Sequence, residues 1–187
     1  MEKLDSLREY KEKRKFDKTP EPAGIVKSSA GKLIFVVQKH DASRLHYDFR
    51  LEIDGVLKSW AVPKGPSLNP KDKRLAVMTE DHPLDYADFE GVIPEGYGAG
   101  TVMVWDHGTV EGVGSTLDEG LKKGHMSFIL KGKKLKGEWS LVQLKGRDDK
   151  NWLLIKKQDE FASEEDVLVS KPDSVLSGKS LKDITGN

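Results

Sequence analysis

The strict alternation of polar and apolar side chains from residue 46 to residue 53 constrains the fold of this chain more than any other feature. The segment reads HYDFRLEI, and a period of two places neighbouring side chains on opposite faces of a β-strand. The pair Asp54-Gly55 follows directly, and such pairs favour the tight turn of a β-hairpin. The segment therefore predicts an antiparallel strand with one apolar face and one polar face.

Short β-strands are expected along most of the chain. Residues 32–62 have a β pattern that includes the apolar run 33–37, and further strands are expected at residues 74–79, 101–105, 109–113, 126–130, 138–144 and 152–156. Helices are expected at residues 3–15 and 116–123, the second of which ends at Gly124. Many short strands joined by tight turns are typical of barrels. We therefore predict a mainly β fold, a closed or nearly closed antiparallel β-barrel with a short N-terminal helix and one or two flanking helices.

Length and composition indicate one folded domain with tails. A chain of 187 residues is long enough for one substantial core. We expect a helical arm and extended segment at residues 1–30, the barrel domain at residues 31–160 and a linker-like tail at residues 161–187. The N-terminus lacks the apolar segment of a signal peptide and no apolar run could span a bilayer, which predicts a cytoplasmic protein. The absence of cysteine excludes disulfides and thiolate metal sites.

The formal net charge is zero, but the charges are grouped along the chain. Residues 131–157 contain nine basic and three acidic side chains, whereas residues 80–95 contain six acidic side chains and no Lys or Arg. The basic stretch suits contact with a phosphate backbone and the acidic one suits the neighbourhood of a metal. Composition alone leaves open that both are solvated faces.

The polar face of the segment 46–53 has the residue types of a catalytic site. His46, Asp48 and Arg50 share that face, about 7 Å apart for every second residue. In the preceding strand Gln38 and His40 share a face, so pairing of the two strands brings His40 beside His46 and Asp48. Two imidazoles and a carboxylate suit Mn²⁺, Fe²⁺ or Zn²⁺. The alternative is an ordinary solvated strand face with a surface histidine at its end.

The segment 80–86 adds polar groups, because His82 and Tyr86 can donate hydrogen bonds or carry protons. Its plainer interpretation is a turn begun by Asp and Pro. His46-x-Asp48 with the later His82 also matches the ligand pattern of non-haem Fe(II) oxygenases. The basic anchor that 2-oxoglutarate enzymes generally need is missing between His82 and Glu95, which weakens this alternative. A non-catalytic barrel that binds nucleic acid or a partner protein stays open as a third class.

Three longer segments resemble one known family. Residues 38–51 (QKHDASRLHYDFRL), 59–66 (SWAVPKGP) and 80–86 (EDHPLDY) are similar to the 3′-phosphoesterase module of bacterial DNA ligase D and its stand-alone archaeal relatives, and the similarity extends from about residue 10 to about residue 157. The resemblance implies a barrel in which His40, His46 and Asp48 hold Mn²⁺ or another divalent transition metal. It further implies a phosphate-binding cluster, which consists of Arg50, His82 and Tyr86.

The same resemblance implies an activity and partners. Members of the family remove a 3′-terminal ribonucleoside from a primer strand and then the 3′-phosphate, leaving a 3′-hydroxyl for ligation in non-homologous end joining. The expected partners are a DNA primer-template, ligase and polymerase domains of the same polypeptide or complex, and the Ku end-binding protein, which implies association with the nucleoid. The further positions that match are Glu80 as a catalytic residue and Gln38, Ser59, Lys64 and Arg74 as substrate-binding residues.

Three features of the chain stand beside this resemblance. The segment 91–98 is one residue shorter than the family pattern, and Lys15 stands where some relatives carry an acid. The tail at residues 174–181 is similar to the sequence that leads from this module into the rest of a multidomain ligase. We therefore expect altered contacts in the 91–98 loop and a domain taken from a larger protein, with a stand-alone protein as the alternative.

Overall fold

The computed structural model describes residues 6–24, 31–146 and 148–186. The strands are β1 (Ile34–Asp41), β2 (Leu45–Ile53), β3 (Val56–Val62), β4 (Arg74–His82), β5 (Gly91–Ile93), β6 (Gly100–Gly112), β7 (His125–Gly132), β8 (Lys136–Gln143) and β9 (Asn151–Lys156). The helices are α2 (Arg8–Glu12), the 3₁₀ helix η1 (Leu84–Asp88), α3 (Leu117–Lys123), α4 (Val167–Ser170) and α5 (Leu181–Thr185).

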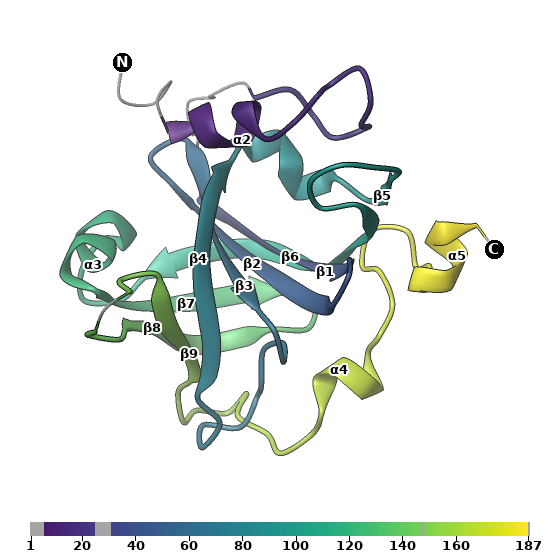
Figure 1. Ribbon diagram of the computed structural model, residues 1–187. Helices are drawn as coiled ribbons and strands as arrows, with labels where there is room; N and C mark the ends of the chain where they lie inside the picture. The colour runs from purple at the N-terminus through teal and green to yellow at the C-terminus, as the bar shows by residue number, and fades with distance from the viewer. Residues whose placement is uncertain (1–5, 25–30, 147, 187) are drawn as a thin grey trace.

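Eight of these strands close into an antiparallel barrel (Figure 1). Around the ring the order is β1-β2-β3-β4-β9-β8-β7-β6, and pairing between β1 and β6 closes it. The short strand β5 pairs with β6 beside the ring. The predicted mainly β barrel with a few short helices is therefore confirmed, and closure removes the open edges that an unpaired sheet would expose.

The predicted hairpin joins β2 to β3. Ile53 pairs with Val56, so the turn consists of Asp54 and Gly55, which have φ angles of 53° and 81°. Positive φ at both central positions defines a type I′ turn, whose twist matches that of the flanking strands. This turn fixes the register in which the polar side chains of β2 meet those of β3.

The prediction of separate strands at 101–105 and 109–113 was wrong, because β6 runs without interruption from Gly100 to Gly112. The intervening Asp106-His107-Gly108 has the composition of a turn, but it stays in the strand and the β1–β6 register shifts beside it. The Asp106 carboxylate accepts hydrogen bonds from the backbone N–H groups of residues 133, 134 and 135. A Cβ on Gly108 would lie 2.0 Å from the Lys131 carbonyl oxygen, so glycine permits this close pairing.

The main core lies inside the barrel. It contains apolar side chains from all eight ring strands, for example Phe35 on β1, Phe49 on β2, Trp139 on β8 and Trp152 on β9. Only the interior face is shared by every strand of a closed ring, so this cluster fills the interior. The apolar face predicted for β2 therefore points inward, and its polar face lies on the outside of the barrel.

The helices lie around the barrel, and α3 and α4 contribute Leu117 and Val167 to the main core. The helix α3 begins after Thr116, whose hydroxyl accepts a hydrogen bond from Glu119 N–H, and ends at Gly124, which has a φ of 77°. The predicted helix at residues 3–15 is shorter, because α2 spans Arg8–Glu12, and residues 3–5 lie outside the described residues. α2 lies beside the end of β4 (Figure 1).

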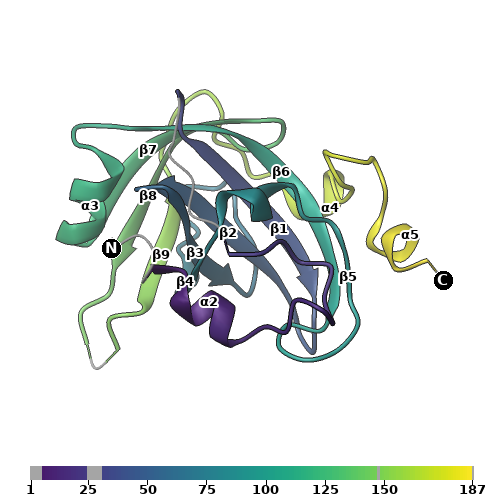
Figure 2. The same cartoon turned by 90° about the horizontal axis from the view of Figure 1, so that it is seen from above.

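The C-terminal residues pack against the barrel. Val167 is buried, and Val175 N–H donates to the Val104 carbonyl along β6. α5 contacts both β5 and β6, and both C-terminal helices lie together on one side of the molecule (Figure 2). In the described ranges, no helix has the length and apolar character needed to cross a membrane.

Candidate metal and phosphate site

A cavity of about 260 Å³ lies on the outer face of β1 to β4. The strands supply its floor, because Asp48 pairs with Ala61, and Arg50 with Ser59, in the β2–β3 register. The N-terminal segment contributes Arg14 and Glu21, and the loop after β5 contributes Tyr97 and Gly98. The polar face of β2 is therefore largely buried instead of solvated.

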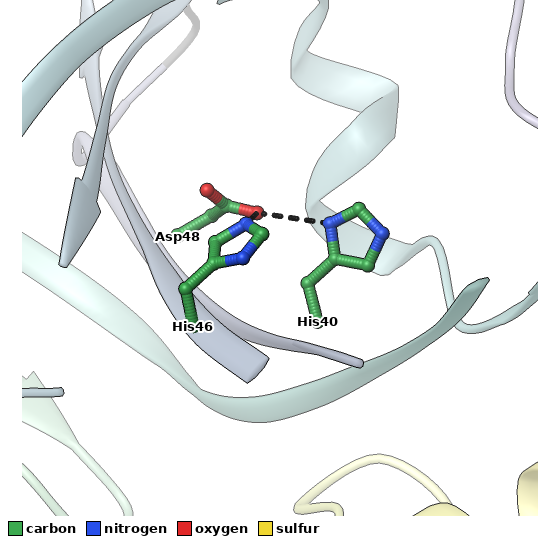
Figure 3. A group of neighbouring side chains, drawn as sticks. All are labelled: His40, His46 and Asp48. Carbon is green, nitrogen blue, oxygen red and sulfur yellow. Dashed lines mark ion pairs between the residues drawn. The ribbon is translucent and has the colours of Figure 1, made fainter. Parts of the chain in front are cut away.

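His40, His46 and Asp48 form one group at this cavity. His40 pairs directly with His46 in the β1–β2 register, and one ligand atom from each of the three residues lies within 4.8 Å of the others. Both imidazole rings turn toward the Asp48 carboxylate (Figure 3). Asp48 Oδ2 lies 3.5 Å from His40 Nδ1 and 3.3 Å from His46 Nε2.

Backbone carbonyls hold the opposite nitrogen of each ring. His40 Nε2 lies 2.7 Å from the Gly98 oxygen, and His46 Nδ1 lies 3.0 Å from the Arg44 oxygen. Since a carbonyl can only accept, each of these nitrogens carries the proton. The other two nitrogens, His40 Nδ1 and His46 Nε2, face the carboxylate: they donate to Asp48 when the rings are protonated and offer lone pairs to a cation when the rings are neutral. Histidine ligands of metals are commonly oriented in this way.

The charges around Asp48 favour its ionised form. Burial disfavours the carboxylate, but Arg50 and hydrogen bonds from the two histidines hold the pKa of Asp48 well below its usual range. Burial also opposes the imidazolium of His46, yet the hydrogen bond and charge of Asp48 outweigh it and raise the pKa of His46. A divalent cation would replace these protons, so the donor set of two nitrogens and one oxygen fits a transition metal.

Arg50 lies beside this group, with its side chain fixed from several sides. Its Nε donates to Gln38 Oε1 at 2.7 Å, and its Nη2 lies 3.5 Å from Asp48 Oδ2. The Gln38 amide in turn donates to the carbonyls of Tyr86 at 2.7 Å and Phe89 at 3.0 Å. The Tyr86 ring centroid lies 5.0 Å from the guanidinium carbon. Arg50 is thus a preorganised donor next to the candidate metal.

His82 is buried and neutral. Its Nδ1 lies 2.9 Å from the Glu80 carbonyl oxygen, 3.2 Å from Arg50 Nη1 and 3.4 Å from Ser59 Oγ. We place the proton on Nδ1 because its shortest contact is to the carbonyl, which only accepts; Nε2, which lies 3.4 Å from Arg14 Nη2, then keeps a lone pair. Burial and the charges of Arg50 and Arg14 hold the pKa of His82 well below its ordinary value.

Two residues of the N-terminal segment that the sequence analysis did not select, Arg14 and Glu21, complete the site. Arg14 pairs with Glu21 at 2.8 Å and with Glu80 at 3.3 Å, and its guanidinium lies 4.1 Å from the Tyr10 ring centroid. Tyr86 donates its hydroxyl proton to Glu21 at 2.6 Å. Burial, followed by the charge of Glu21, raises the pKa of Tyr86 well above 10, so the phenol stays protonated. In sequence these charges look like any helical arm, and Arg14 following Tyr10 by four residues is the only signal.

Glu80 joins the arm to the barrel. Its side chain also accepts from Lys13 Nζ at 3.4 Å and from the Tyr97 hydroxyl at 3.2 Å. Burial opposes ionisation, but its own backbone N–H together with Lys13 and Arg14 lowers the pKa of Glu80. The structure therefore places Glu80 among cations at the edge of the cavity.

Two of the predicted substrate-binding residues lie outside the cavity. Arg74 is at the opposite end of β4 from Glu80, about 20 Å away at the rise of a β-strand, and it pairs with Asp72 at 3.7 Å. Lys64 is exposed in the turn after β3. Gln38 and Ser59 lie beneath Arg50 and His82, where they contact these side chains instead of the open cavity.

Comparisons with known proteins agree with this geometry. The family described as DNA Ligase D 3′-phosphoesterase domain matches residues 38–143. The multifunctional non-homologous end joining protein LigD of Pseudomonas aeruginosa is 58% identical over 186 residues, which cover 94% of this chain and 22% of that protein. Its counterpart from Mycobacterium tuberculosis is 46% identical over 144 residues, covering 76% and 19%.

A third relative, LigD of Mycolicibacterium smegmatis, is 43% identical over 163 residues, covering 83% of this chain and 21% of the relative. The chain spans about a fifth of the length of the curated relatives it matches. The family match covers more than half of the chain, and it includes every strand residue that lines the cavity. The chain belongs to the DNA ligase D 3′-phosphoesterase domain family.

Proposed function

We propose that this chain is a Mn²⁺-dependent phosphoesterase that processes 3′ ends of DNA for non-homologous end joining. It removes a 3′-terminal ribonucleoside from a primer strand and then the remaining 3′-phosphate, leaving a 3′-hydroxyl. The observation that carries this proposal is the position of Arg50 Nη2, which lies 3.5 Å from Asp48 within the candidate metal group. One cavity thus combines a site for a divalent cation with a fixed guanidinium that suits phosphate.

We assign the metal to His40, His46 and Asp48. The bound metal would supply Lewis acidity toward a phosphate oxygen. The same nitrogen and oxygen donor set would accept other divalent transition metals. Loss of any one of these three side chains should therefore abolish both cleavage steps while the barrel, whose core lies on the other face of β2, still folds.

The other residues bind and position the phosphate. Arg50 donates to its oxygens as negative charge develops on them, at a position fixed by Gln38. His82 takes up a proton only once the phosphate charge offsets Arg50 and Arg14, since these cations keep it neutral beforehand. Tyr86 stays protonated and supports Arg50 with its ring, while Glu80 holds Arg14 at the cavity. Ser59 supports His82 from below.

The names of the relatives, which are multifunctional end-joining proteins, support the partners that we propose. We propose a DNA primer-template with a 3′-ribonucleotide or 3′-phosphate as substrate. Ligase and polymerase domains of the same polypeptide or complex, with Ku at the DNA end, would act before and after this step. Such a protein works on the nucleoid in the cytoplasm.

An oxygenase is the weaker alternative. Its ligand pattern needs His82, but both nitrogens of His82 already face Glu80, Arg50 and Arg14, and the metal-competent group contains His40 instead. The phosphoesterase should keep full activity in anaerobic buffer with Mn²⁺. If removing dioxygen stops turnover, the phosphoesterase assignment is wrong.

One assay tests the proposal directly. A 5′-labelled primer-template that ends in a single ribonucleotide is incubated with Mn²⁺, Mg²⁺, Zn²⁺ or chelator. We expect Mn²⁺ to give a product one nucleoside shorter with a 3′-phosphate and then a 3′-hydroxyl end. His46→Ala should give neither product, whereas His125→Ala, which changes an exposed histidine on β7, should match the parent. Near-normal Mn²⁺-dependent turnover by His46→Ala would refute the metal assignment.

A further inference from the structure

Tyr97 lies where three hollows of the surface meet. It lines the cavity that contains the candidate metal group, a hollow of about 360 Å³ beside the N-terminal segment and a groove of about 520 Å³ along β4. Tyr97 has 48% of its surface exposed. Among the described residues that line the cavity, it is the one large apolar or aromatic residue that is exposed. The proposed cleavage of phosphate esters gives no role to a half-exposed aromatic ring at this position.

The position of this ring is fixed relative to the site. Its hydroxyl donates to Glu80 Oε1 at 3.2 Å, so the polar tip is held in place while 48% of the residue's surface stays exposed to a ligand. Lys13 Nζ lies 4.6 Å from the ring centroid. The next residue, Gly98, accepts the hydrogen bond from His40 Nε2 at 2.7 Å. Tyr97 is therefore connected to the candidate metal ligand His40 through the backbone of the next residue and one hydrogen bond.

The surroundings of the ring match one end of a nucleic-acid strand. Lys13 and Arg14 lie against the ring, and Lys15 and Lys18 line the adjoining hollow. An aromatic surface is thus surrounded by cations that can bind the phosphates next to a stacked base. Proteins that bind single strands without reading sequence combine these two elements, because every base has a face that can stack. A protein or peptide partner would not need a phosphate site next to the ring.

We propose that Tyr97 is the surface on which the terminal nucleobase of the processed strand stacks while its 3′ end lies beside Arg50. This proposal rests on the proposed function and specifies how the substrate is positioned. Stacking tolerates any base, so Tyr97 contributes affinity and alignment for an end of any sequence. It predicts that ends with a missing terminal base are poorer substrates.

The test compares two primer-templates that end in a 3′-phosphate, one with an intact terminal base and one with an abasic terminal sugar. With the intact base, Tyr97→Leu should lower kcat/KM about tenfold to a hundredfold, mainly through KM, the range for losing one stacked base. With the abasic end, Tyr97→Leu should match the parent. Tyr97→Phe should restore most of the loss, and Phe161→Leu, at an exposed aromatic residue after β9, is the matched control.

Binding of the same two substrates in chelator provides a readout without cleavage. Fluorescence anisotropy should show weaker binding by Tyr97→Leu only for the substrate that has its terminal base. An equal loss on both substrates, or no rescue by Tyr97→Phe, would mean that Tyr97 only holds the loop, and the stacking proposal would fall. If the parent cleaves neither substrate, the proposed function fails, and the binding comparison still decides whether Tyr97 stacks.

Discussion

Gln38 fixes the direction of Arg50: its side-chain oxygen accepts a hydrogen bond from Arg50 Nε at 2.7 Å. The Gln38 amide nitrogen donates to two backbone carbonyls, those of Tyr86 and Phe89, so the oxygen has only one orientation available. All of these groups are buried. The guanidinium that we assign to phosphate is therefore aimed by a side chain that itself never reaches the cavity surface.

Gln38→Met should disturb both stability and turnover. The change keeps the side-chain volume but removes the partner of Arg50 Nε and the amide donor to the Phe89 carbonyl, while the Tyr86 carbonyl keeps its bond from Phe89 N–H. We expect a cost of about 2–4 kcal/mol of unfolding free energy. A loosened Arg50 should lower kcat about tenfold or more, because alignment is lost. Urea denaturation and primer cleavage measure the two effects. The control is Gln143→Met, whose amide bonds a carbonyl on an exposed hairpin. Parent-like values for Gln38→Met would remove Gln38 as the positioning residue.

Arg50→Lys should slow both cleavage steps about a hundredfold to a thousandfold. Lysine keeps the charge but loses the planar fork, and the loss of one preorganised donor costs about 2–4 kcal/mol of transition-state stabilisation. Mn²⁺ affinity, measured by calorimetry, should change far less, since Arg50 is not a ligand. Arg74→Lys, at the opposite end of β4, should stay within a few-fold of the parent. Activity of Arg50→Lys close to that of the parent would exclude Arg50 from the site.

His82 should make the metal-free protein less stable as the pH falls. Its pKa in the folded protein is well below its ordinary value because of burial, Arg50 and Arg14, whereas the unfolded chain titrates near pH 6.5. Below about pH 6.5 the unfolded state therefore binds more protons, and stability falls by up to about 1.4 kcal/mol per pH unit. Urea denaturation in chelator from pH 8 to pH 5 should show this decline in the parent relative to His82→Asn.

His46 supplies the opposite sign and so an internal control. Its folded pKa is raised, so its stabilisation is present below pH 6.5 and is lost as the pH rises through the folded value. The difference in unfolding free energy between parent and His46→Ala should therefore shrink toward high pH in chelator.

The outcome for His82 is decided separately. If the unfolding free energies of the parent and His82→Asn decline in parallel below pH 6.5, His82 is not held neutral by its surroundings.

The sequence predicts the barrel and the arrangement of its polar face because both depend on local patterns. Alternation in β2 separates inward from outward side chains, and the turn at Asp54 and Gly55 sets the register. Pairing of β1 with β2 then places His40 beside His46, as the shared strand face predicted. Period, turn chemistry and pairing act over a few residues, so a single sequence is enough to read them.

The covering of that face could not be predicted, because it depends on tertiary contacts. Arg14 and Glu21 reach the cavity only because Tyr10 is buried against His82 and Tyr86, and nothing in the local pattern distinguishes them from solvated charges. Lys64 and Arg74 lie outside the cavity, since a match to a motif does not say which part of the surface a residue reaches, and their role in substrate binding stays a prediction. The basic stretch at 131–157 does not form one exposed surface, because Lys156 is buried against Asp159. Residue 147 of this stretch lies outside the described residues.

Gly98 links the backbone of the 91–98 loop to the candidate metal group. Its φ is +77°, in the left-handed region that favours glycine, and its carbonyl accepts the proton of His40 Nε2 at 2.7 Å. A Cβ at this position would lie 3.5 Å from His40 Cε1, an ordinary contact. A side chain here therefore acts through backbone strain instead of a clash.

Gly98→Ala should weaken metal binding about tenfold to a hundredfold, the usual effect of losing a partner that orients a histidine ligand. Alanine disfavours the left-handed backbone by about 1–2 kcal/mol, so the loop relaxes and its carbonyl moves away from His40. Gly114→Ala is the matched control, because Gly114 has a φ of +80° and open space around its Cβ, in the loop before α3. Both variants should lose similar stability in urea, but only Gly98→Ala should bind Mn²⁺ more weakly by calorimetry. If Gly98→Ala binds Mn²⁺ as tightly as the parent, the Gly98 carbonyl does not orient His40. If Gly98→Ala and Gly114→Ala lose the same Mn²⁺ affinity, the loss comes from strain that spreads through the barrel.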